Sequence, residues 1–268
     1  MRVAVAARGV ASAVEHRFGG ALKTLSRVPD SASRRAFFWP ADERDHPDGH
    51  EDTPLHCPVC EADATRPFQR IDTRNYWRCE ACDATFLDPA QRPDHATERA
   101  EYDLHQNDPR DSGYRSFLAR LATPLLERLP PGAHGLDYGC GPGPALAGML
   151  REAGHAVALY DPFFHPDTSP LQTRHDFITC TEVIEHFHAP AQEFRRLDAL
   201  LQPGGWLALM TCFQTDDARF AQWHYRRDPT HVVFYREATL AHIAGRHGWA
   251  MSVPQRNVAL MHKPLVGA

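Results

Sequence analysis

The sequence predicts an α/β protein with a mostly parallel sheet, preceded by a small metal-binding module. Apolar strand-like and helix-like segments alternate from Ala133 onward, and a glycine-rich turn follows the first strand. Two C-x2-C pairs, at Cys57–Cys60 and Cys79–Cys82, indicate the metal-binding module. Alternating strands and helices form parallel sheets whose functional crevice lies at the carboxyl ends of the strands.

The composition is that of an ordinary globular protein. Of the 268 residues, 24% are charged and 43% are hydrophobic, and the formal net charge is −5. The negative charge argues against a nucleic-acid or anionic-membrane binder. No apolar run of about eighteen residues predicts a membrane span. Because four of the seven cysteines fall in the two pairs, the sequence favours a reduced, cytoplasmic compartment.

Residues 1–53 are predicted to be a tail. Glu15 is the only acidic residue before Asp30, as in an organelle transit segment. A disordered extension and an over-long gene model are the preferred interpretations. The apolar stretch at 34–40, RRAFFWP, has the composition of a docking segment.

Residues 54–88 are predicted to form a zinc ribbon. The pattern C-x2-C-x18-C-x2-C lies within the spacing range of four-cysteine zinc sites. Four thiolates close a tetrahedral shell and leave no open position for chemistry, so the ion is structural. A segment with so few apolar side chains needs such a staple to fold. The predicted ligands are Cys57, Cys60, Cys79 and Cys82.

Residues 89–131 are predicted to be a polar connector and a helix that covers the main domain. The helix covers GYRSFLARLATPLLERL, and its apolar face contains Phe117, Leu118, Leu121, Leu125 and Leu129. Thr123 and Pro124 predict a kink or a restart there. Pro130, Pro131 and Gly132 end the helix.

Residues 132–268 are predicted to form the main domain. Strands are predicted at HGLDY, HAVALYD, DFITCTEVIEH, WLALMT, WAMSV and VALMHK, and helices at PALAGMLREAG, PAQEFRRLDALLQPGG and YREATLAHIAGRHGW. Asp137, Asp161 and Glu182 each end a strand and therefore point into the crevice.

The glycine-rich turn excludes two common phosphate-binding loops. A Walker loop requires lysine after its last glycine, but Pro144 follows Gly143. The dinucleotide fingerprint requires a glycine at position 144. What remains is acid-x-G-x-G-x-G, made of Asp137, Gly139, Gly141 and Gly143.

This pattern resembles motif I of the class I S-adenosylmethionine-dependent methyltransferases. The stretch DFITCTEVIEHFHAP followed by LLQPGGWLALMT resembles their second signature. Residues 113–263 are similar to the small-molecule methylases that include the quinone-type enzymes, above all to bacterial members with an N-terminal zinc knuckle. The resemblance implies a Rossmann-like sheet and S-adenosyl-L-methionine as cofactor.

The resemblance also implies roles for individual residues. The three glycines would line the methionine part of the cofactor by main chain, with Asp137 beside its ammonium group. Asp161 would hold the ribose and Phe163 would flank the adenine, while Thr181 and Glu182 would face the methionine part and the acceptor. Only fourteen residues separate Asp161 from Asp176, so the usual third helix and strand do not fit and the sheet is shortened.

Methyl transfer requires an aligned nucleophile and, for a hydroxyl or amine, a base that titrates near neutral pH. The candidate bases are His186, His188, His224 and His231. The resemblance also makes Glu182, Glu185 and His186 a candidate divalent-ion site. Alternatively, Glu185 and His186 tie the turn to the next helix, and His231 pins the hairpin.

The favoured function is methyl transfer to oxygen or carbon of a small molecule. Arg226 and Arg227 predict an anionic acceptor, unless they pair with surface aspartates. One alternative is a zinc-knuckle RNA methyltransferase; another is a non-enzymatic cofactor-binding scaffold whose ribbon docks a partner. The sequence carries no signal for an oligomeric state.

Overall fold

The computed structural model describes residues 55–104 and 107–265. The tail predicted at residues 1–53, with its RRAFFWP stretch, therefore lies outside the described residues. Among the described helices, none has the length and apolar character that crossing a membrane requires.

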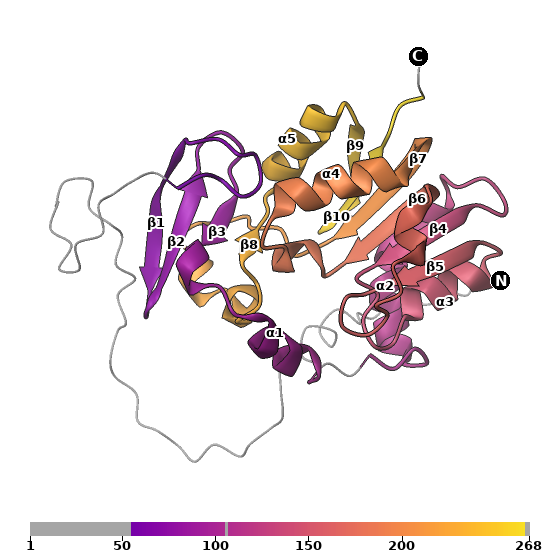
Figure 1. The fold of residues 1–268 in the computed structure, drawn as a ribbon, viewed down its shortest axis with the longest axis horizontal. Helices are drawn as coiled ribbons and strands as arrows, with labels where there is room; N and C mark the ends of the chain where they lie inside the picture. The colour runs from indigo at the N-terminus through magenta and orange to yellow at the C-terminus, as the bar shows by residue number, and fades with distance from the viewer. Residues whose placement is uncertain (1–54, 105–106, 266–268) are drawn as a thin grey trace, which may run out of the picture. The chain divides into compact units, whose positions relative to one another are not determined.

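The main sheet has six strands in the order β5-β4-β6-β7-β10-β9 (Figure 1). The pairs β5–β4, β4–β6 and β6–β7 are parallel, and β10 runs antiparallel to both of its neighbours. The mostly parallel sheet is confirmed. The strands are β4 (His134–Tyr138), β5 (Ala156–Tyr160), β6 (His175–Thr181), β7 (Leu201–Met210), β9 (Ala250–Gln255) and β10 (Val258–His262).

Helices cover both faces of this sheet. Successive strand residues point to opposite sides, so each face presents its own set of apolar side chains for a helix to cover. On β7, Leu207 and Leu209 pack into one hydrophobic cluster, whereas Ala208 and Met210 pack into the other. The second cluster contains residues of α2 (Ser112–Leu126) and α3 (Ala145–Glu152). The first contains residues of α4 (Pro190–Leu200) and α5 (Glu237–His247).

The sheet lacks a strand beyond β5, as the short loop between Asp161 and Asp176 predicts. That loop holds an isolated bridge between Asp161 and His165 and a 3-10 turn at Ser169–Gln172, and β5 is the edge strand among the described residues. The shortened sheet is therefore confirmed.

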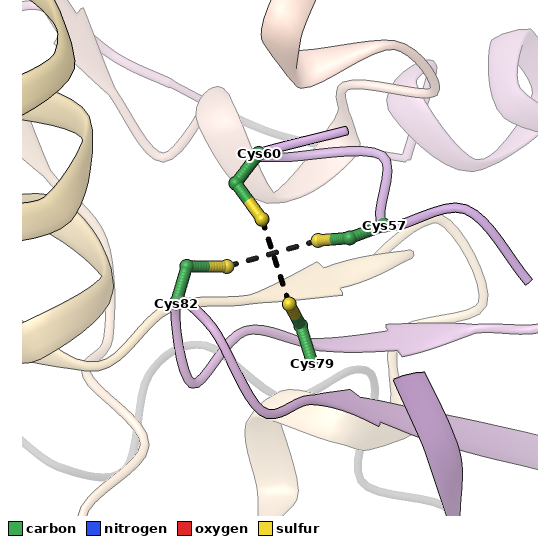
Figure 2. A group of neighbouring side chains, drawn as sticks. All are labelled: Cys57, Cys60, Cys79 and Cys82. Carbon is green, nitrogen blue, oxygen red and sulfur yellow. Dashed lines mark hydrogen bonds between the residues drawn. The ribbon is translucent and has the colours of Figure 1, made fainter. Parts of the chain in front are cut away.

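A second sheet contains the ribbon strands β1 (Thr65–Ile71), β2 (Arg74–Cys79) and β3 (Thr85–Leu87). Its fourth strand, β8 (Val233–Phe234), comes from far along the chain and pairs antiparallel with β3. The two cysteine pairs meet beside these strands (Figure 2). The division into a ribbon at 54–88, a cover at 89–131 and a main domain at 132–268 stays a prediction.

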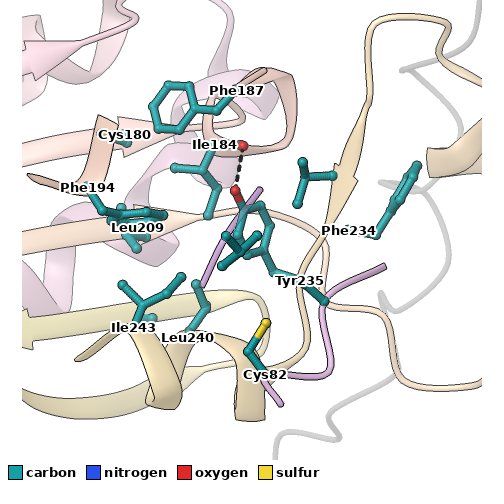
Figure 3. Packing of buried hydrophobic residues seen from close by; sticks show 14 of the residues in the cluster. Cys82, Cys180, Ile184, Phe187, Phe194, Leu209, Phe234, Tyr235, Leu240 and Ile243 are labelled. Atoms are coloured by element: carbon teal, nitrogen blue, oxygen red, sulfur yellow. Dashed lines mark hydrogen bonds between the residues drawn. The ribbon is translucent and has the colours of Figure 1, made fainter. Parts of the chain in front are cut away.

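The ribbon and the main sheet share one hydrophobic core. Cys82 of the ribbon lies in the same buried cluster as Ile184, Phe194 and Leu240 (Figure 3). This continuity explains how a segment with few apolar residues can bury its four cysteines.

Two helical predictions require correction. The predicted polar connector contains a helix, α1 (His95–Tyr102), with Asp94 as its N-cap. No residue of α1 is fully buried, so its sequence has no apolar face from which the helix could be predicted. Helix α2 continues through Pro124 and ends at Leu126, rather than restarting at the proline. Pro124 lies in the last turn, and the burial of Leu121 and Leu125 on either side of it compensates the N–H bond that the proline cannot make.

Tyr235 provides a test of the shared core. Its hydroxyl donates to the Ile184 carbonyl at 2.9 Å, and its side chain is fully buried (Figure 3). Tyr235→Phe removes this buried hydrogen bond, although the Ile184 carbonyl still accepts the Phe187 N–H at 3.2 Å. We therefore expect the substitution to lower the free energy of unfolding by about 0.5–1.5 kcal/mol. Urea titration followed by tryptophan fluorescence measures this; an unchanged midpoint and slope would show that the hydroxyl contributes nothing.

Candidate active site

The glycine turn adopts backbone conformations that only glycine takes without strain. Gly139 has φ of 78° and Gly141 has φ of 64°. A Cβ at position 139 would lie 2.5 Å from Val183 Cγ2, so the turn contacts the segment that follows β6. At position 143, a Cβ would lie 1.9 Å from the Asn107 carbonyl oxygen. Close packing on both sides explains why glycine stands at these two positions.

Asp161 fixes the turn from the end of the neighbouring strand. Its Oδ2 accepts the Gly141 N–H at 3.0 Å, and its Oδ1 accepts the N–H groups of Phe163 and Phe164 at 2.8 and 3.0 Å. A carboxylate has about four lone-pair sites. Three bonds therefore hold the side chain at the carboxyl end of the sheet and leave room for a ligand hydroxyl.

Phe163 lies under α1, the helix that the sequence does not predict. Its ring stacks on His95 with centroids 4.6 Å apart and meets the edge of Tyr102 at 5.0 Å. Its carbonyl accepts a hydrogen bond from Arg99 Nη1. Helix α1 therefore covers the loop after Asp161, on the side where the sequence places an adenine.

Asp137 is a buried carboxyl group below the glycine turn. Thr179 Oγ1 donates to it at 2.7 Å, but burial dominates and raises the pKa of Asp137 to about 6. Tyr114 of α2 lies near both Asp137 and Glu182; burial and these two carboxylates raise the pKa of Tyr114 to about 12. Thr181 Oγ1, at the end of β6, is buried without a hydrogen-bond partner.

Two acidic side chains follow β6. Glu182 has φ of 52°, and its N–H donates to the Met210 carbonyl at 2.7 Å. Glu185 is fully buried; its Oε1 accepts the Tyr225 hydroxyl, and its Oε2 is buried without a hydrogen-bond partner. Burial raises the pKa of both carboxyl groups, and the charge of Glu185 raises that of Glu182 further.

Two histidines lie beside Glu185 with their tautomers set by backbone carbonyls. His186 Nδ1 lies 3.1 Å from the Thr230 carbonyl, and His231 Nδ1 lies 2.7 Å from the Tyr225 carbonyl. A carbonyl only accepts, so each Nδ1 carries hydrogen and each neutral ring keeps its lone pair on Nε2. The two rings meet edge to face at 4.7 Å, and His186 Nε2 lies 3.9 Å from Glu185 Oε1.

Glu185, His186 and His231 together form a group able to hold a metal ion. One ligand atom from each lies within 4.8 Å of the others. The sequence predicts a metal site made of Glu182, Glu185 and His186. In the structure, His231 takes the place of Glu182 in this group. Histidine ligands of metals commonly donate the other ring N–H to a carbonyl, as both of these do.

The remaining histidine and arginine candidates lie outside this group. His188 pairs with Glu98 of α1 at 3.0 Å, and His224 is exposed. Arg226 is buried, and its guanidinium donates to the Tyr76 hydroxyl and the Ala221 carbonyl. That side chain is therefore committed to the ribbon and its own loop, and Arg227 is the exposed member of the pair.

Sequence reasoning missed Tyr225 as a site residue. Its hydroxyl bridges Glu185 and Thr211, at 2.9 Å from Thr211 Oγ1, and its carbonyl orients His231. The signal available was the run WHYRRDPTH, in which a tyrosine sits among candidate bases. Its partners are distant in sequence, so only the fold identifies them.

The four ribbon cysteines form a second group with metal-ligand geometry (Figure 2). The Sγ atoms of Cys57 and Cys82 are 3.7 Å apart, and those of Cys60 and Cys79 are 3.5 Å apart. A tetrahedral ion with Zn–S bonds of about 2.3 Å places its sulfurs about 3.8 Å apart. The two turns match: Glu61 N donates to the Cys57 carbonyl and Asp83 N to the Cys79 carbonyl, both with positive φ. The cluster thus suggests a zinc site.

Residues 80–252 match the family described as "Methyltransferase domain". The chain belongs to this family. It is a class I S-adenosylmethionine-dependent methyltransferase with a Rossmann-like sheet. Comparison with curated proteins gave no significant match.

Solved methyltransferases are similar at low identity. The 1,6-didemethyltoxoflavin-N1-methyltransferase of Burkholderia thailandensis, with bound 1,6-didemethyltoxoflavin and S-adenosylhomocysteine, is 20% identical; the match covers 74% of this chain and 99% of that chain, with a TM-score of 0.48. The magnesium protoporphyrin IX methyltransferase of Synechocystis PCC 6803, with bound SAH, is 16% identical, with 63% and 94% covered and a TM-score of 0.43.

Asp137 should make the stability of this methyltransferase depend on pH. A carboxyl whose folded pKa is raised stabilises the fold below its unfolded pKa, and this contribution is lost as pH rises to the folded pKa of about 6. We expect Asp137→Asn, which can still accept from Thr179, to become more stable relative to wild type by about 2–3 kcal/mol between pH 4 and pH 7. Urea titrations across this range measure the difference; a constant difference would contradict the raised pKa.

Proposed function

We propose that the protein transfers a methyl group from S-adenosylmethionine to oxygen or carbon of a small-molecule acceptor. The observation that carries this proposal is the contact between the glycine turn and the segment after β6. Gly139 packs against Val183, which lies between Glu182 and Glu185 in the sequence. Glu185 Oε1, which accepts the Tyr225 hydroxyl, lies 3.9 Å from His186 Nε2. A cofactor site and an acid–base cluster are thereby adjacent at the carboxyl ends of the strands.

The residues around the turn fit the proposed cofactor. The buried, unpartnered Thr181 hydroxyl offers a hydrogen bond at the strand end, and Asp137 supplies a carboxylate near it once ionised. We assign Gly139, Gly141 and Gly143 to the methionine part, Asp161 to the ribose, and Phe163 under α1 to the adenine. When bound, S-adenosylmethionine supplies an activated methyl group.

The histidine pair fits the role of general base. We assign proton removal from the acceptor to His186 Nε2, because Nδ1 is already bonded to the Thr230 carbonyl. Glu185 Oε1, 3.9 Å away, stabilises the imidazolium that forms. His231 lies edge to face with His186, and Glu182 directly precedes Val183, which packs against Gly139. We assign both His231 and Glu182 to orienting the acceptor.

Calorimetric titration with S-adenosylhomocysteine tests the cofactor assignment. We expect micromolar binding to wild type and a loss of at least tenfold in Asp161→Ala, because that variant removes a ribose acceptor and three bonds that shape the turn. Asp167→Ala is the matched control, since Asp167 is an exposed acid in the same loop. No binding to the metal-replete, full-length wild type would refute the proposed function.

We propose an alternative role for the same group, in which Glu185, His186 and His231 hold a divalent ion. His186 Nε2 would then be a ligand rather than the base, and the ion would supply a Lewis acid that lowers the pKa of an acceptor hydroxyl. The unpartnered Glu185 Oε2 and the two Nε2 lone pairs form a two-histidine, one-carboxylate set. Two nearby buried carboxyl groups with raised pKa values add a further reason, since a cation relieves their repulsion.

Manganese binding tests this site. We expect the zinc-loaded wild type to bind one Mn²⁺ by electron paramagnetic resonance, and Glu185→Gln to weaken binding by at least tenfold because the amide is neutral. Glu237→Gln, an exposed acid at the start of α5, is the control. Equal Mn²⁺ binding by wild type and Glu185→Gln would exclude the site and leave His186 as a simple base.

The residues of the ribbon help to choose between small-molecule methyl transfer and the two alternatives, an RNA methyltransferase and a non-enzymatic scaffold. We propose that Cys57, Cys60, Cys79 and Cys82 hold one structural zinc ion. Four arginines of the ribbon could serve an RNA enzyme: Arg66, Arg70, Arg74 and Arg78. Of these, Arg78 is buried against Asp217 and Arg66 pairs with Glu80, whereas Arg70 is exposed and Arg74 is half-buried. The site itself carries carboxylates rather than a free pair of arginines, so we favour a neutral or hydroxylated acceptor over an anionic one. Membership in the methyltransferase family favours an enzyme over a scaffold.

A further inference from the structure

The insert segment, residues 212–235, contacts the zinc ribbon and the candidate active site at once. On the ribbon side, Val233–Phe234 pairs with β3, and the Leu87 N–H donates to the Val232 carbonyl at 2.9 Å. On the site side, the Val232 N–H donates to the Glu185 carbonyl at 2.9 Å. A single residue, Val232, therefore joins the ribbon to the acidic turn by its two backbone groups.

Side chains repeat this double contact along the insert segment. Phe220 meets the edges of Phe68 and Tyr76 at 5.3 and 5.0 Å. Arg226 donates to the Tyr76 hydroxyl at 3.3 Å, while the adjacent Tyr225 holds Glu185 and His231. The residues that shape the acid–base cluster are thus next in sequence to residues seated on the ribbon.

Arg78 is the charged centre of this contact. Its Nη2 lies 2.7 Å from Asp217 Oδ1, its Nε donates to Thr85 Oγ1 at 2.9 Å, and its side chain is almost wholly buried. Asp217 also pairs with Arg236 at the start of α5 and accepts from Gln69 through its carbonyl. Moving Arg78 away from Asp217 would leave a buried charge without its partner, which is costly. The contact therefore holds both side chains in place.

We infer that the zinc ribbon is a positioning element of the active site, and that Arg78 is the positioning residue that connects them. Arg78 directly precedes Cys79, and the Cys79 N–H donates to the Ala84 carbonyl at 2.9 Å. Closing this turn on a metal fixes β2 against β3, which presents Arg78 to Asp217 and β3 to β8. The insert segment then holds Tyr225 and His231 at Glu185. The inference rests on the proposed function only for the chemical role of that cluster.

Hydrogen exchange in Arg78→Gln tests the connection without any acceptor. We expect the zinc-loaded variant to exchange residues 212–235 at least about tenfold faster than wild type, because the segment loses its buried ion pair. Residues 134–181 should keep their protection, and S-adenosylhomocysteine affinity should change less than about twofold. Arg78→Lys should restore part of the protection. Arg66→Gln, which removes an exposed ribbon arginine paired with Glu80, is the matched control.

A spectroscopic measurement at His231 separates positioning from loss of the fold. In wild type, 15N-histidine spectra, assigned with His231→Gln, should show hydrogen on Nδ1 of His231; Arg78→Gln should shift this ring toward the Nε2–H form common in water. An unchanged tautomer with unchanged exchange at 212–235 would overturn the inference. Faster exchange throughout 57–262 with loss of S-adenosylhomocysteine binding would also overturn it, because the ribbon would then support only the fold. Failure of methyl transfer alone touches the proposed function and not this inference.

Discussion

The candidate site depends on the burial of Glu185. A carboxyl group removed from water is costly unless hydrogen bonds or charges compensate it, and Glu185 is fully buried in a short turn after β6. Tyr225 donates to its side chain, Val232 donates to its carbonyl, and two histidines stand beside it. All but one of these partners come from the insert segment. Satisfying one acidic side chain therefore requires a long loop to return to the sheet in a single conformation.

The same requirement explains why the ribbon and the sheet share one core. One stretch of the insert segment, with Asp216, Ala218 and Arg219, is exposed. The next residue, Phe220, is buried against ribbon side chains. The ribbon in turn gains from the insert segment the strand that completes its own sheet. The ribbon and the α4/α5 face of the sheet therefore form a single core.

The sequence predicted the sheet well because its signals are local. Strand and helix periodicities, Gly248 at the end of α5, and the short loop after Asp161 each lie within a few residues of what they determine. The signal of the cysteine pairs is local in the same way, since each turn orients two thiols. Helix α1 was missed because it buries no residue fully, and Pro124 was overestimated because tertiary burial outweighs one lost bond.

The long-range part of the site could not be predicted from such signals. Arg78 is an ordinary arginine in a polar strand until the fold buries it against Asp217, 139 residues away. For Arg226 the sequence suggested a ligand where the fold provides an internal partner. The pair Arg226 and Arg227 suggests an anion site, but the Arg226 guanidinium donates to the Tyr76 hydroxyl. A charged residue in a sequence indicates a ligand site only when the fold gives its side chain no partner within the protein. Burial raises the pKa of both carboxyl groups after β6, and chemistry is expected where such a perturbation lies at the carboxyl ends of parallel strands.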